Sequence, residues 1–433
     1  MTGKSRLFLN HMYGCMRKIL FLITGLLIST APSFSQDSGA LIEALIRKGI
    51  LTNQEAEDIR ADLVVENNTL PSKAIAGGKS TDRLSVGMRM QLQYASLDTD
   101  LPVGKIQPSY TDQTFTRRMY FTLKAGVGGN WEATMTYDFS GGSYDDAIIE
   151  YKPTSDLSFN FGLRKVNNAY EERATSGNLR SIERSGVTRY FVENNNGRRL
   201  GAASYRIGAF VDGKKELNNR FNFIYGAAIT NPQRDETFSG ASSSGTYTNN
   251  SKALWSNVGT IYKLPENGSI LIGLSGAYLP DQGGPSNTNL GKGNHLRLYS
   301  VHADATYKKF TFMVEYLTAN IDKGASITRN ATPKGWFVQP TFYLAEDIEV
   351  VVRYQTLDTD YRGLNLGDVV RSAPTGGTMN KFDEYYLGGN LYVRGNDLKF
   401  QLGILSGRTY ETLQGQSDSA KVFGARSQLQ IQF

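Results

Sequence analysis

From residue 84 to the end of the chain, apolar and polar residues alternate with a period of two. In the first such segment the apolar face consists of Val86, Met88, Met90, Leu92 and Tyr94. The residues between them, among them Arg89, Gln91 and Gln93, are polar and suit contact with water. This alternation predicts a strand with lipid on one side and an aqueous lumen on the other. A strand of a soluble sandwich also alternates, but rarely over about ten residues.

Sixteen segments carry this pattern, and the connections between them alternate in length. We expect strands at 84–96, 115–125, 131–139, 144–152, 157–163, 200–211, 219–230, 254–263, 269–278, 295–307, 310–319, 335–344, 348–357, 382–394, 398–406 and 421–433. Every second connection is short and those between are mostly long, with 140–143 as the exception. The sequence therefore predicts an all-β fold, a transmembrane antiparallel β-barrel of about 16 strands, with 14 or 18 as alternatives.

The last segment ends in an aromatic residue. Its apolar face consists of Phe423, Ala425, Leu429, Ile431 and Phe433. A terminal phenylalanine after an alternating run resembles the carboxy-terminal recognition signal of bacterial outer-membrane proteins. We therefore expect the outer-membrane assembly machinery to be a partner, bound through Phe433.

Residues 1–35 have the features of a signal peptide. Arg17 and Lys18 precede the short apolar run 19–28, and Ser33 and Ser35 offer small residues for cleavage near Gln36. The apolar run is shorter than the roughly 20 residues that a membrane-spanning helix needs. Residues 1–15 read as an upstream extension, with Met16 as an alternative start. Cys15 is the only cysteine, so thiol chemistry and disulfides are excluded from the processed chain.

Two short helices are expected between the signal peptide and the barrel. Apolar residues recur at helical spacing in 41–46 and 56–63, and Thr52 with Glu55 forms a capping box for the second helix. We assign 36–68 to a periplasmic helical hairpin, 69–83 to a linker and 84–433 to the barrel. We expect the hairpin to serve in packing or assembly. Alternatively, it is a coiled-coil trimerisation element.

Overall charge gives no support for a nucleic-acid partner. Residues 1–35 hold four basic residues and no acidic ones, which leaves 43 basic and 41 acidic residues and a net charge of about +2. The mean hydropathy of −0.36 is too polar for a helical membrane protein. Together with 45 glycines and 24 tyrosines, it suits alternating strands and many turns.

The longest connection, 164–199, concentrates positive charge and is the candidate constriction loop. It holds four glutamates and eight basic residues: Arg164, Lys165, Arg173, Arg180, Arg184, Arg189, Arg198 and Arg199. By this strand count it is the third external loop, which in sixteen-stranded porins folds inward and narrows the pore. Basic side chains in such a constriction favour anions. Alternatively, they pair with the four glutamates or with lipopolysaccharide phosphates.

A second basic feature lies on the strands. The alternation places Arg89, Arg118 and Arg426 on the lumen faces of the first, second and last strands, which are neighbours once the barrel closes. With Lys124 they predict a positive lumen wall, and Glu132, Asp138 and Glu150 predict an acidic patch beside it. The field between them would orient dipolar solutes. Ordinary clustering of charges on a polar face is the alternative.

Enzymatic chemistry is not expected. Ser300, His302 and Asp304 share one strand face, but side chains at i and i+2 lie about 6.6–7 Å apart, too far for the hydrogen bonds of a catalytic triad. No cofactor is expected. Asp98, Asp100, Asp358 and Asp360 form two Asp-x-Asp pairs that could bind calcium, although aspartates more often begin turns.

Several stretches together resemble the phosphate-selective porin O and P family. These are 117–121 (Arg-Arg-Met-Tyr-Phe), 131–139, 161–166 (Phe-Gly-Leu-Arg-Lys-Val) and 181–185 (Ser-Ile-Glu-Arg-Ser). The resemblance implies a homotrimeric sixteen-stranded porin among outer-membrane lipid and lipopolysaccharide, with Lys165 and the loop arginines lining an anion path. The family usually continues lysine-valine with proline-phenylalanine, where this chain has Asn167-Asn168.

The resemblance and the charge pattern together favour passive diffusion of small hydrophilic solutes. Small anionic solutes are the preferred class, with phosphate as one candidate and general anion preference as the firmer expectation. A non-selective general porin and a structural or adhesive surface barrel without an open pore are the alternatives.

Overall fold

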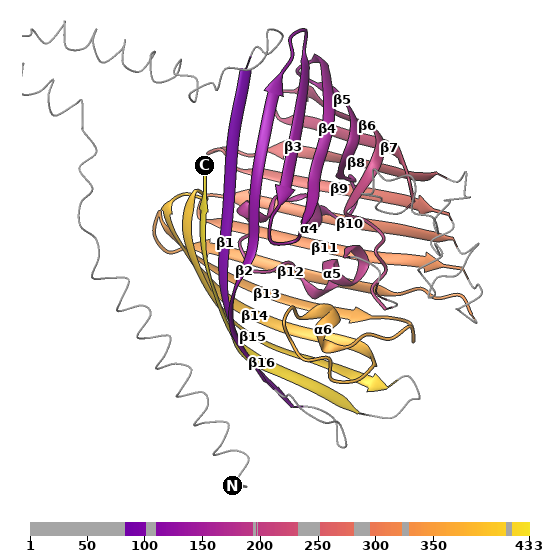
Figure 1. The fold of residues 1–433 in the computed structure, drawn as a ribbon, viewed down its shortest axis with the longest axis vertical. Coiled ribbons are helices and arrows are strands. Elements are labelled where there is room, and N and C mark those ends of the chain that lie inside the picture. Colours follow the sequence, from indigo (N-terminus) through magenta and orange to yellow (C-terminus); the bar gives the residue numbers. More distant parts are fainter. Residues whose placement is uncertain are drawn as a thin grey trace, which may run out of the picture. The chain divides into compact units, whose positions relative to one another are not determined.

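The computed structural model describes residues 83–100, 110–193, 196, 198–232, 252–280, 295–322, 329–412 and 418–433. In this part of the chain, sixteen antiparallel strands pair with their neighbours in sequence, and the first pairs with the last to close a barrel (Figure 1). The strands are β1 (Arg83–Asp100), β2 (Tyr110–Gly126), β3 (Trp131–Asp138), β4 (Ser143–Thr154), β5 (Leu157–Lys165), β6 (Tyr205–Asn218), β7 (Phe221–Thr230), β8 (Ala253–Lys263), β9 (Ser269–Leu279), β10 (Leu296–Tyr307), β11 (Phe310–Ile321), β12 (Lys334–Tyr343), β13 (Ile348–Asp358), β14 (Met379–Arg394), β15 (Leu398–Thr412) and β16 (Ser419–Gln432).

Each of the sixteen predicted segments corresponds to one of these strands, so the predicted barrel is confirmed. The predicted signal peptide, the helical hairpin and the linker up to residue 82 lie outside the described residues. Among the described residues, no helix is long and apolar enough to cross a membrane.

The predicted bounds of the sixth strand are wrong at both ends. Residues 200–204 belong to the preceding loop, because Leu200 and Ala202 bond through their backbone amides to Tyr190 and Phe191 of that loop. At the other end, the expected turn 212–218 continues the strand and pairs with β7 as far as Asn218. The alternation of apolar residues alone could not distinguish loop from strand at these two ends, since a buried loop segment can also place apolar residues at every second position.

Proline in the twelfth strand is accommodated locally. Pro340 keeps its place beside β11, but the pairing between β12 and β13 skips Gln339 and Pro340. The strand survives because proline removes one ladder hydrogen bond rather than the whole pairing.

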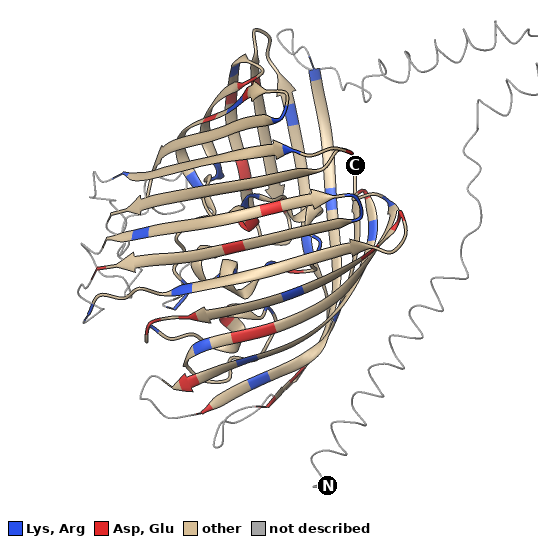
Figure 2. Cartoon of the chain, turned by 180° about the vertical axis from the view of Figure 1, so that it is seen from behind, with Lys and Arg blue, Asp and Glu red and all other residues tan. Residues whose placement is uncertain are grey.

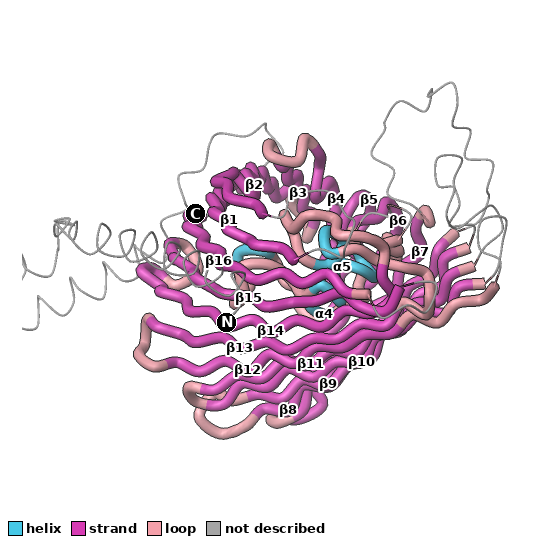
Figure 3. The backbone as a smooth tube through the Cα atoms, turned by 90° about the horizontal axis from the view of Figure 1, so that it is seen from below, coloured by secondary structure: helices cyan, strands magenta, loops and turns pink. Residues whose placement is uncertain are grey.

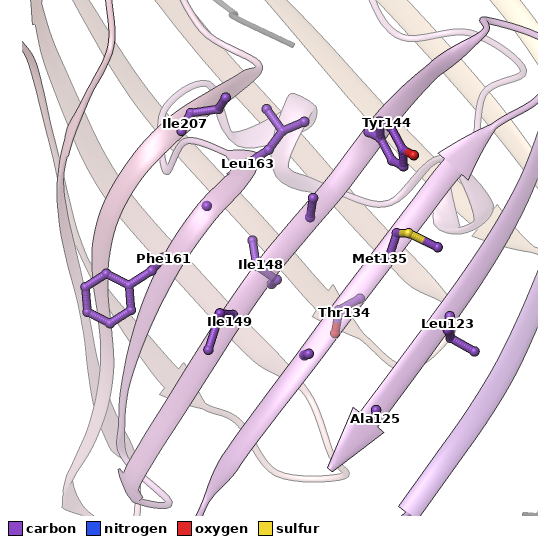
Figure 4. Close-up of a pocket in the computed structure, with 13 residues that line it drawn as sticks. Leu123, Ala125, Thr134, Met135, Tyr144, Ile148, Ile149, Phe161, Leu163 and Ile207 are labelled. Carbon is purple, nitrogen blue, oxygen red and sulfur yellow. The ribbon is translucent and has the colours of Figure 1, made fainter. Parts of the chain in front are cut away.

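The outward face of the barrel is apolar. Side chains that face outward and are more than a third exposed include Leu92, Phe121, Met135, Ile149, Phe161, Leu254, Ile272, Leu274, Val301, Phe342, Val352, Ile404, Leu429 and Ile431. Charged residues are scattered between long uncharged stretches of the strands (Figure 2). A groove of about 480 Å³ crosses this face over β2–β6, where Leu123, Met135 and Phe161 surround smaller residues (Figure 4). Such a surface matches the hydrocarbon of a membrane.

The C-terminal residue completes the barrel seam. The backbone amide and carbonyl of Phe433 exchange two 3.1 Å hydrogen bonds with Met88 of β1. Its ring is 75% exposed. The terminal residue therefore belongs to the sheet, and its side chain is accessible from outside.

Short helices lie inside the ring of strands (Figure 3). Between β5 and β6 the chain forms α4 (Tyr170–Arg173), a 3₁₀ turn η1 (Ser176–Asn178) and α5 (Gly186–Val192), and between β13 and β14 it forms α6 (Leu366–Val369). Two loops therefore enter the lumen.

Candidate functional site

The loop between β5 and β6 fills part of the lumen with a hydrophobic core. Ser185 caps α5 by accepting a hydrogen bond from the amide of Thr188. Val187, Tyr190 and Phe191 of α5 are completely buried. They pack in one cluster with inward residues of the far wall, among them Leu298, Leu317, Phe337, Leu357 and Phe382. The predicted inward fold of this loop agrees with these contacts.

Polar side chains of the wall hold the loop backbone in place. Lys399 of β15 donates to the carbonyls of Gly177 (2.7 Å) and Leu179 (2.9 Å). Gln91 of β1 donates to the carbonyl of Ser176, and Glu315 of β11 accepts from the amide of Glu171. Because these bonds satisfy buried backbone groups of the loop, each stabilises its inward position.

The loop between β13 and β14 forms a second inward element, which the sequence did not reveal. Arg198 bonds to Asp368 of α6 at 2.5 Å. Arg371 donates to Glu183 at 3.1 Å and also bonds to Glu193. The two loops pack tightly at Gly186, because a Cβ there would lie 2.9 Å from Val369. Arg371 is thus a site residue that sequence analysis missed.

A polar cavity of about 1090 Å³ runs between the inward loops and the wall formed by β1–β5. It extends from Gly87 and Phe433, near the short turns, to Ser143 and Arg199, near the long loops. Nine basic residues line it: Arg89, Arg117, Arg118, Arg164, Lys165, Arg173, Arg184, Arg199 and Arg371. Six acidic residues do so as well: Asp138, Asp145, Asp146, Glu172, Glu193 and Asp397. The lining therefore carries an excess of three positive charges.

Two β-bulges direct pairs of like charges into this cavity. On β2 the register passes from Arg118 opposite Gln91 to Thr116 opposite Leu92, so Arg117 is the extra residue. On β4 the register passes from Asp146 to Tyr144, so Asp145 is extra. All four charged residues line the cavity. Strict alternation would turn one residue of each pair outward, and a bulge removes that constraint.

The bulged arginine pair has different partners. Arg118 donates to Gln91 at 2.8 Å, and Arg117 donates to Glu183 of the loop at 2.6 Å. Arg118 is 3% exposed. Arg118 thus lies on the lumen side, where the alternation places it, while Arg117 links the wall to the loop.

Most of the predicted constriction cations are engaged with carboxylates. The ion pairs are Arg164–Asp212 (2.5 Å), Lys165–Glu172 (3.0 Å), Arg180–Glu349 (3.2 Å), Arg184–Glu172 (3.0 Å), Arg189–Glu193 (3.2 Å), Arg198–Asp368 (2.5 Å) and Arg199–Glu193 (3.0 Å). Arg173 has no ion-pair partner among the described residues, and it lines the cavity. Arg180, Arg189 and Arg198 do not line it. Five of the eight residues predicted for the anion path therefore line the cavity.

The predicted positive wall is only partly assembled. Arg89 and Arg118 line the cavity, and Arg89 donates to Gln432 and Ser176. Arg426 faces the lumen but lies behind the loops, where it bonds to the carbonyl of Arg371. Lys124 is paired with Glu132 at 2.7 Å outside the cavity lining. Lys124 therefore does not belong to the wall, because β2 carries it close to the short turn at Gly126.

The expected acidic patch is corrected as well. Glu132 lies directly opposite Glu150 near the short turns, where Lys124 and Lys152 neutralise them. Asp138 lies at the other end of β3. The carboxylates that accompany it along the cavity are Asp145 and Asp146 of β4.

Two loop glutamates are anions that organise the constriction, Glu183 buried and Glu193 half-buried. Burial alone raises the pKa of a carboxyl, but Arg117 and Arg371 outweigh it and hold the pKa of Glu183 well below its usual range. For Glu193, the effect of burial is outweighed by Arg189, Arg371 and Arg199, which lower its pKa to about 2. Both glutamates are therefore charged at neutral pH.

The residues weighed for calcium binding lie on β1, at the end of β13 and just after it, and His302 contacts the inward loop. Among the described residues, no group of three or more histidine, cysteine, aspartate or glutamate side chains could hold a metal ion. Asp360 instead bonds to Arg329 (3.0 Å) and to the amide of Thr332 (2.7 Å). Asp98 and Asp100 end β1, and Asp358 ends β13. The ring of His302 stacks on the ring of Tyr170 in the loop, with 4.4 Å between the ring centroids.

Comparisons with known proteins agree with this architecture. The family described as "Phosphate-selective porin O and P" matches residues 85–433. Among solved structures, the anion-selective porin from Comamonas acidovorans is similar with a TM-score of 0.52 and 10% identity, over 80% of this chain and 99% of that chain. OprB of Pseudomonas putida has a TM-score of 0.49 and 12% identity, over 80% and 94%. OmpT of Vibrio cholerae has a TM-score of 0.47 and 14% identity, over 82% and 99%. No curated protein sequence matches this chain significantly.

Proposed function

Because the chain belongs to the phosphate-selective porin O and P family, we propose that it lets small hydrophilic solutes, preferably anions, diffuse passively through its polar cavity. It is a multi-pass β-barrel of the outer membrane, and its family and fold are those of a channel rather than of an enzyme. The observation that carries the proposal is the excess of three positive charges along the cavity, from Arg89 near the short turns to Arg199 and Arg371 near the long loops.

The physical reason is local rather than global. In a narrow, partly desolvated passage, fixed positive charges stabilise an entering anion and repel a cation. Arg173 supports this role, because among the described residues it lines the cavity without an ion-pair partner. Guanidinium groups also match tetrahedral oxyanions such as phosphate through paired N–H donors. Phosphate is accordingly one proposed solute within a broader anion preference.

The position where the chain departs from the family pattern bears on phosphate. Asn167 bonds to Asp212 and accepts from Arg164 at 3.1 Å. Arg164 also contacts Asp212 at 2.5 Å. This triad occupies the entry to the loop, so Arg164 is less available to a solute than Arg173. We therefore propose general anion preference ahead of phosphate specificity.

Further parts of the proposal concern partners. The outward apolar band suits outer-membrane lipid and lipopolysaccharide, and the family resemblance favours a homotrimer. The exposed ring of Phe433 at the end of the seam suits recognition by the outer-membrane assembly machinery.

The proposal is tested electrically with the purified protein in a planar bilayer. In a KCl gradient we expect conductance steps and a reversal potential on the anion side. Arg118→Gln should move the reversal potential toward zero, and Arg408→Gln should not, because Arg408 is exposed and paired with Asp383 outside the cavity. Absence of conductance would contradict the pore, and a reversal potential on the cation side would contradict the anion preference.

One observation favours a second candidate, a general porin with little charge preference. Seven of the eight predicted constriction cations are paired with carboxylates, which reduces the field they exert on a solute. For this candidate the reversal potential stays near zero, and Arg118→Gln leaves it there.

A further inference from the structure

A second cavity, of about 20 Å³, lies behind the inward loops. Its charged lining consists of two glutamates, Glu183 and Glu384, and five arginines: Arg184, Arg189, Arg353, Arg371 and Arg426. Three elements of the lumen converge here, since Arg189 belongs to α5, Arg353 to β13 and Arg426 to β16. On the same measure, about 10–15 Å³ is enough for one water molecule. The cavity therefore holds a single small particle and excludes a tetrahedral oxyanion.

Several arginine donors around this cavity have no acceptor. Arg189, Arg353 and Arg426 are 3%, 3% and 2% exposed. Among the described residues, no acceptor bonds to Nη1 of Arg189, Nε of Arg353 or Nη1 of Arg426. Buried charged donors without partners are rare because each loses its hydration without replacement. Three such nitrogens on residues that line one cavity indicate an acceptor inside it.

The surrounding charge indicates what kind of acceptor fits. Five guanidinium groups face two carboxylates in the lining, so the side chains of the lining carry an excess of three positive charges. Three further carboxylates reach the arginines from outside it, Glu172 at 3.0 Å from Arg184, Glu193 at 3.2 Å from Arg189 and Glu171 at 3.7 Å from Arg353. Two of these are shared with cations outside the lining, Glu172 with Lys165 and Glu193 with Arg199. A water molecule accepts through only two lone pairs, whereas a monatomic anion accepts from every side. Tyr386, Val369, Val370 and Leu405 complete the lining, and their apolar surface strengthens the attraction by excluding water.

We infer that this cavity binds one dehydrated monatomic anion, chloride in ordinary salt solutions. The anion offsets part of the excess charge and links α5 to the wall strands β13 and β16, so it fixes the constriction loop in its inward position. The site adjoins the large cavity, since Arg184 and Arg371 line both, but Arg189, Arg353 and Arg426 line only the small one. The inference does not depend on whether the pore prefers anions.

Anomalous diffraction from crystals of the full-length protein grown in sodium bromide tests the inference. We expect an anomalous peak within contact distance of Arg189, Arg353 and Arg426. Density without an anomalous signal would identify a water molecule and overturn the inference. Peaks confined to the large cavity would also overturn it, while supporting the anion path.

Thermal unfolding gives a second test that needs no crystal. The melting temperature should be higher in sodium chloride than in sodium gluconate at equal ionic strength, because gluconate is too large for the cavity. Arg426→Gln should abolish this difference, and the matched variant Arg89→Gln, which changes an arginine of the large cavity only, should keep it. If Arg426→Gln does not fold, the wild-type comparison still decides, since equal melting temperatures in the two salts would contradict a bound halide.

Discussion

The two halves of the lumen wall follow the same alternation but present opposite interiors. On β1–β5 the inward side chains include Arg89, Arg118 and Asp146, and these face an open polar cavity. On β10–β14 they include Leu317, Phe337 and Phe382, and these are buried beneath the two loops. The comparison shows that hydrophobic packing on one side of the barrel leaves the polar cavity on the other side. In the proposed function, the charges of that cavity select the solute.

The largest effect is expected from truncating a buried side chain of the wall on β10–β14, which is packed against the inward loops. Phe337→Ala removes a completely buried ring under α5, and such truncations cost about 3–5 kcal/mol of unfolding free energy. Denaturant unfolding measures the change. The matched variant Phe342→Ala, on the outward face of the same strand, should lose much less. Equal losses would show that the loop core does not stabilise the barrel.

A smaller effect is expected from separating the two inward loops. Arg371→Gln removes the cation that joins Glu183 and Glu193, and leaving the buried carboxylate of Glu183 underpaired costs about 1–3 kcal/mol. Unfolding and single-channel noise are the measurements, and we expect lower stability with noisier current. Arg408→Gln, which breaks an exposed pair, should cost at most about 1 kcal/mol. If the single-channel noise of Arg371→Gln equals that of the wild-type protein, Arg371 does not hold the two loops together.

The wall on β1–β5, which faces the open cavity, can be made more positive by a single substitution. Asp146→Asn removes a carboxylate from the cavity, and a unit charge about 10 Å from a solute contributes roughly 0.4–1.7 kcal/mol at an effective dielectric constant of 20–80. The reversal potential should therefore move further to the anion side. Asp397→Asn, at the other end of the cavity, provides the comparison. A shift toward the cation side in either variant would contradict the proposed field.

The smallest effect is expected from mild acid. The folded-state pKa of Glu193 is about 2, below its ordinary value of 4.5, and that of Glu183 is also well below its ordinary value. Groups with depressed pKa contribute stability that is complete above the unfolded pKa and is lost only as pH falls through the folded pKa. Between pH 7 and 5, these two glutamates should therefore change the melting temperature and the single-channel noise very little. Below pH 4, Glu193→Gln should lose less stability than the wild-type protein. Loosening of the loop near pH 6 would contradict this assignment.

Alternation and loop length were enough to predict the strands, the inward loop and the lumen positions of Arg89 and Arg118. They failed where local geometry departs from alternation. Arg117 and Asp145 face inward only because of bulges, and a bulge has no signature in hydrophobic period. Residues 200–204 read as a strand because burial against α5 selects the same residue types as lipid does.

The sequence by itself determined the barrel, because a period of two over many strands can satisfy both lipid and water only when the sheet closes. It also determined that positive charge gathers in one loop. Only the tertiary structure decided which of those charges line the cavity. Ion pairing depends on distances between residues far apart in the chain, such as Arg371 and Glu183, or Arg198 and Asp368. Coulomb energy becomes weaker as the distance between charges or the dielectric constant between them increases. Composition alone therefore could not distinguish an arginine held in an ion pair from one that lines the cavity.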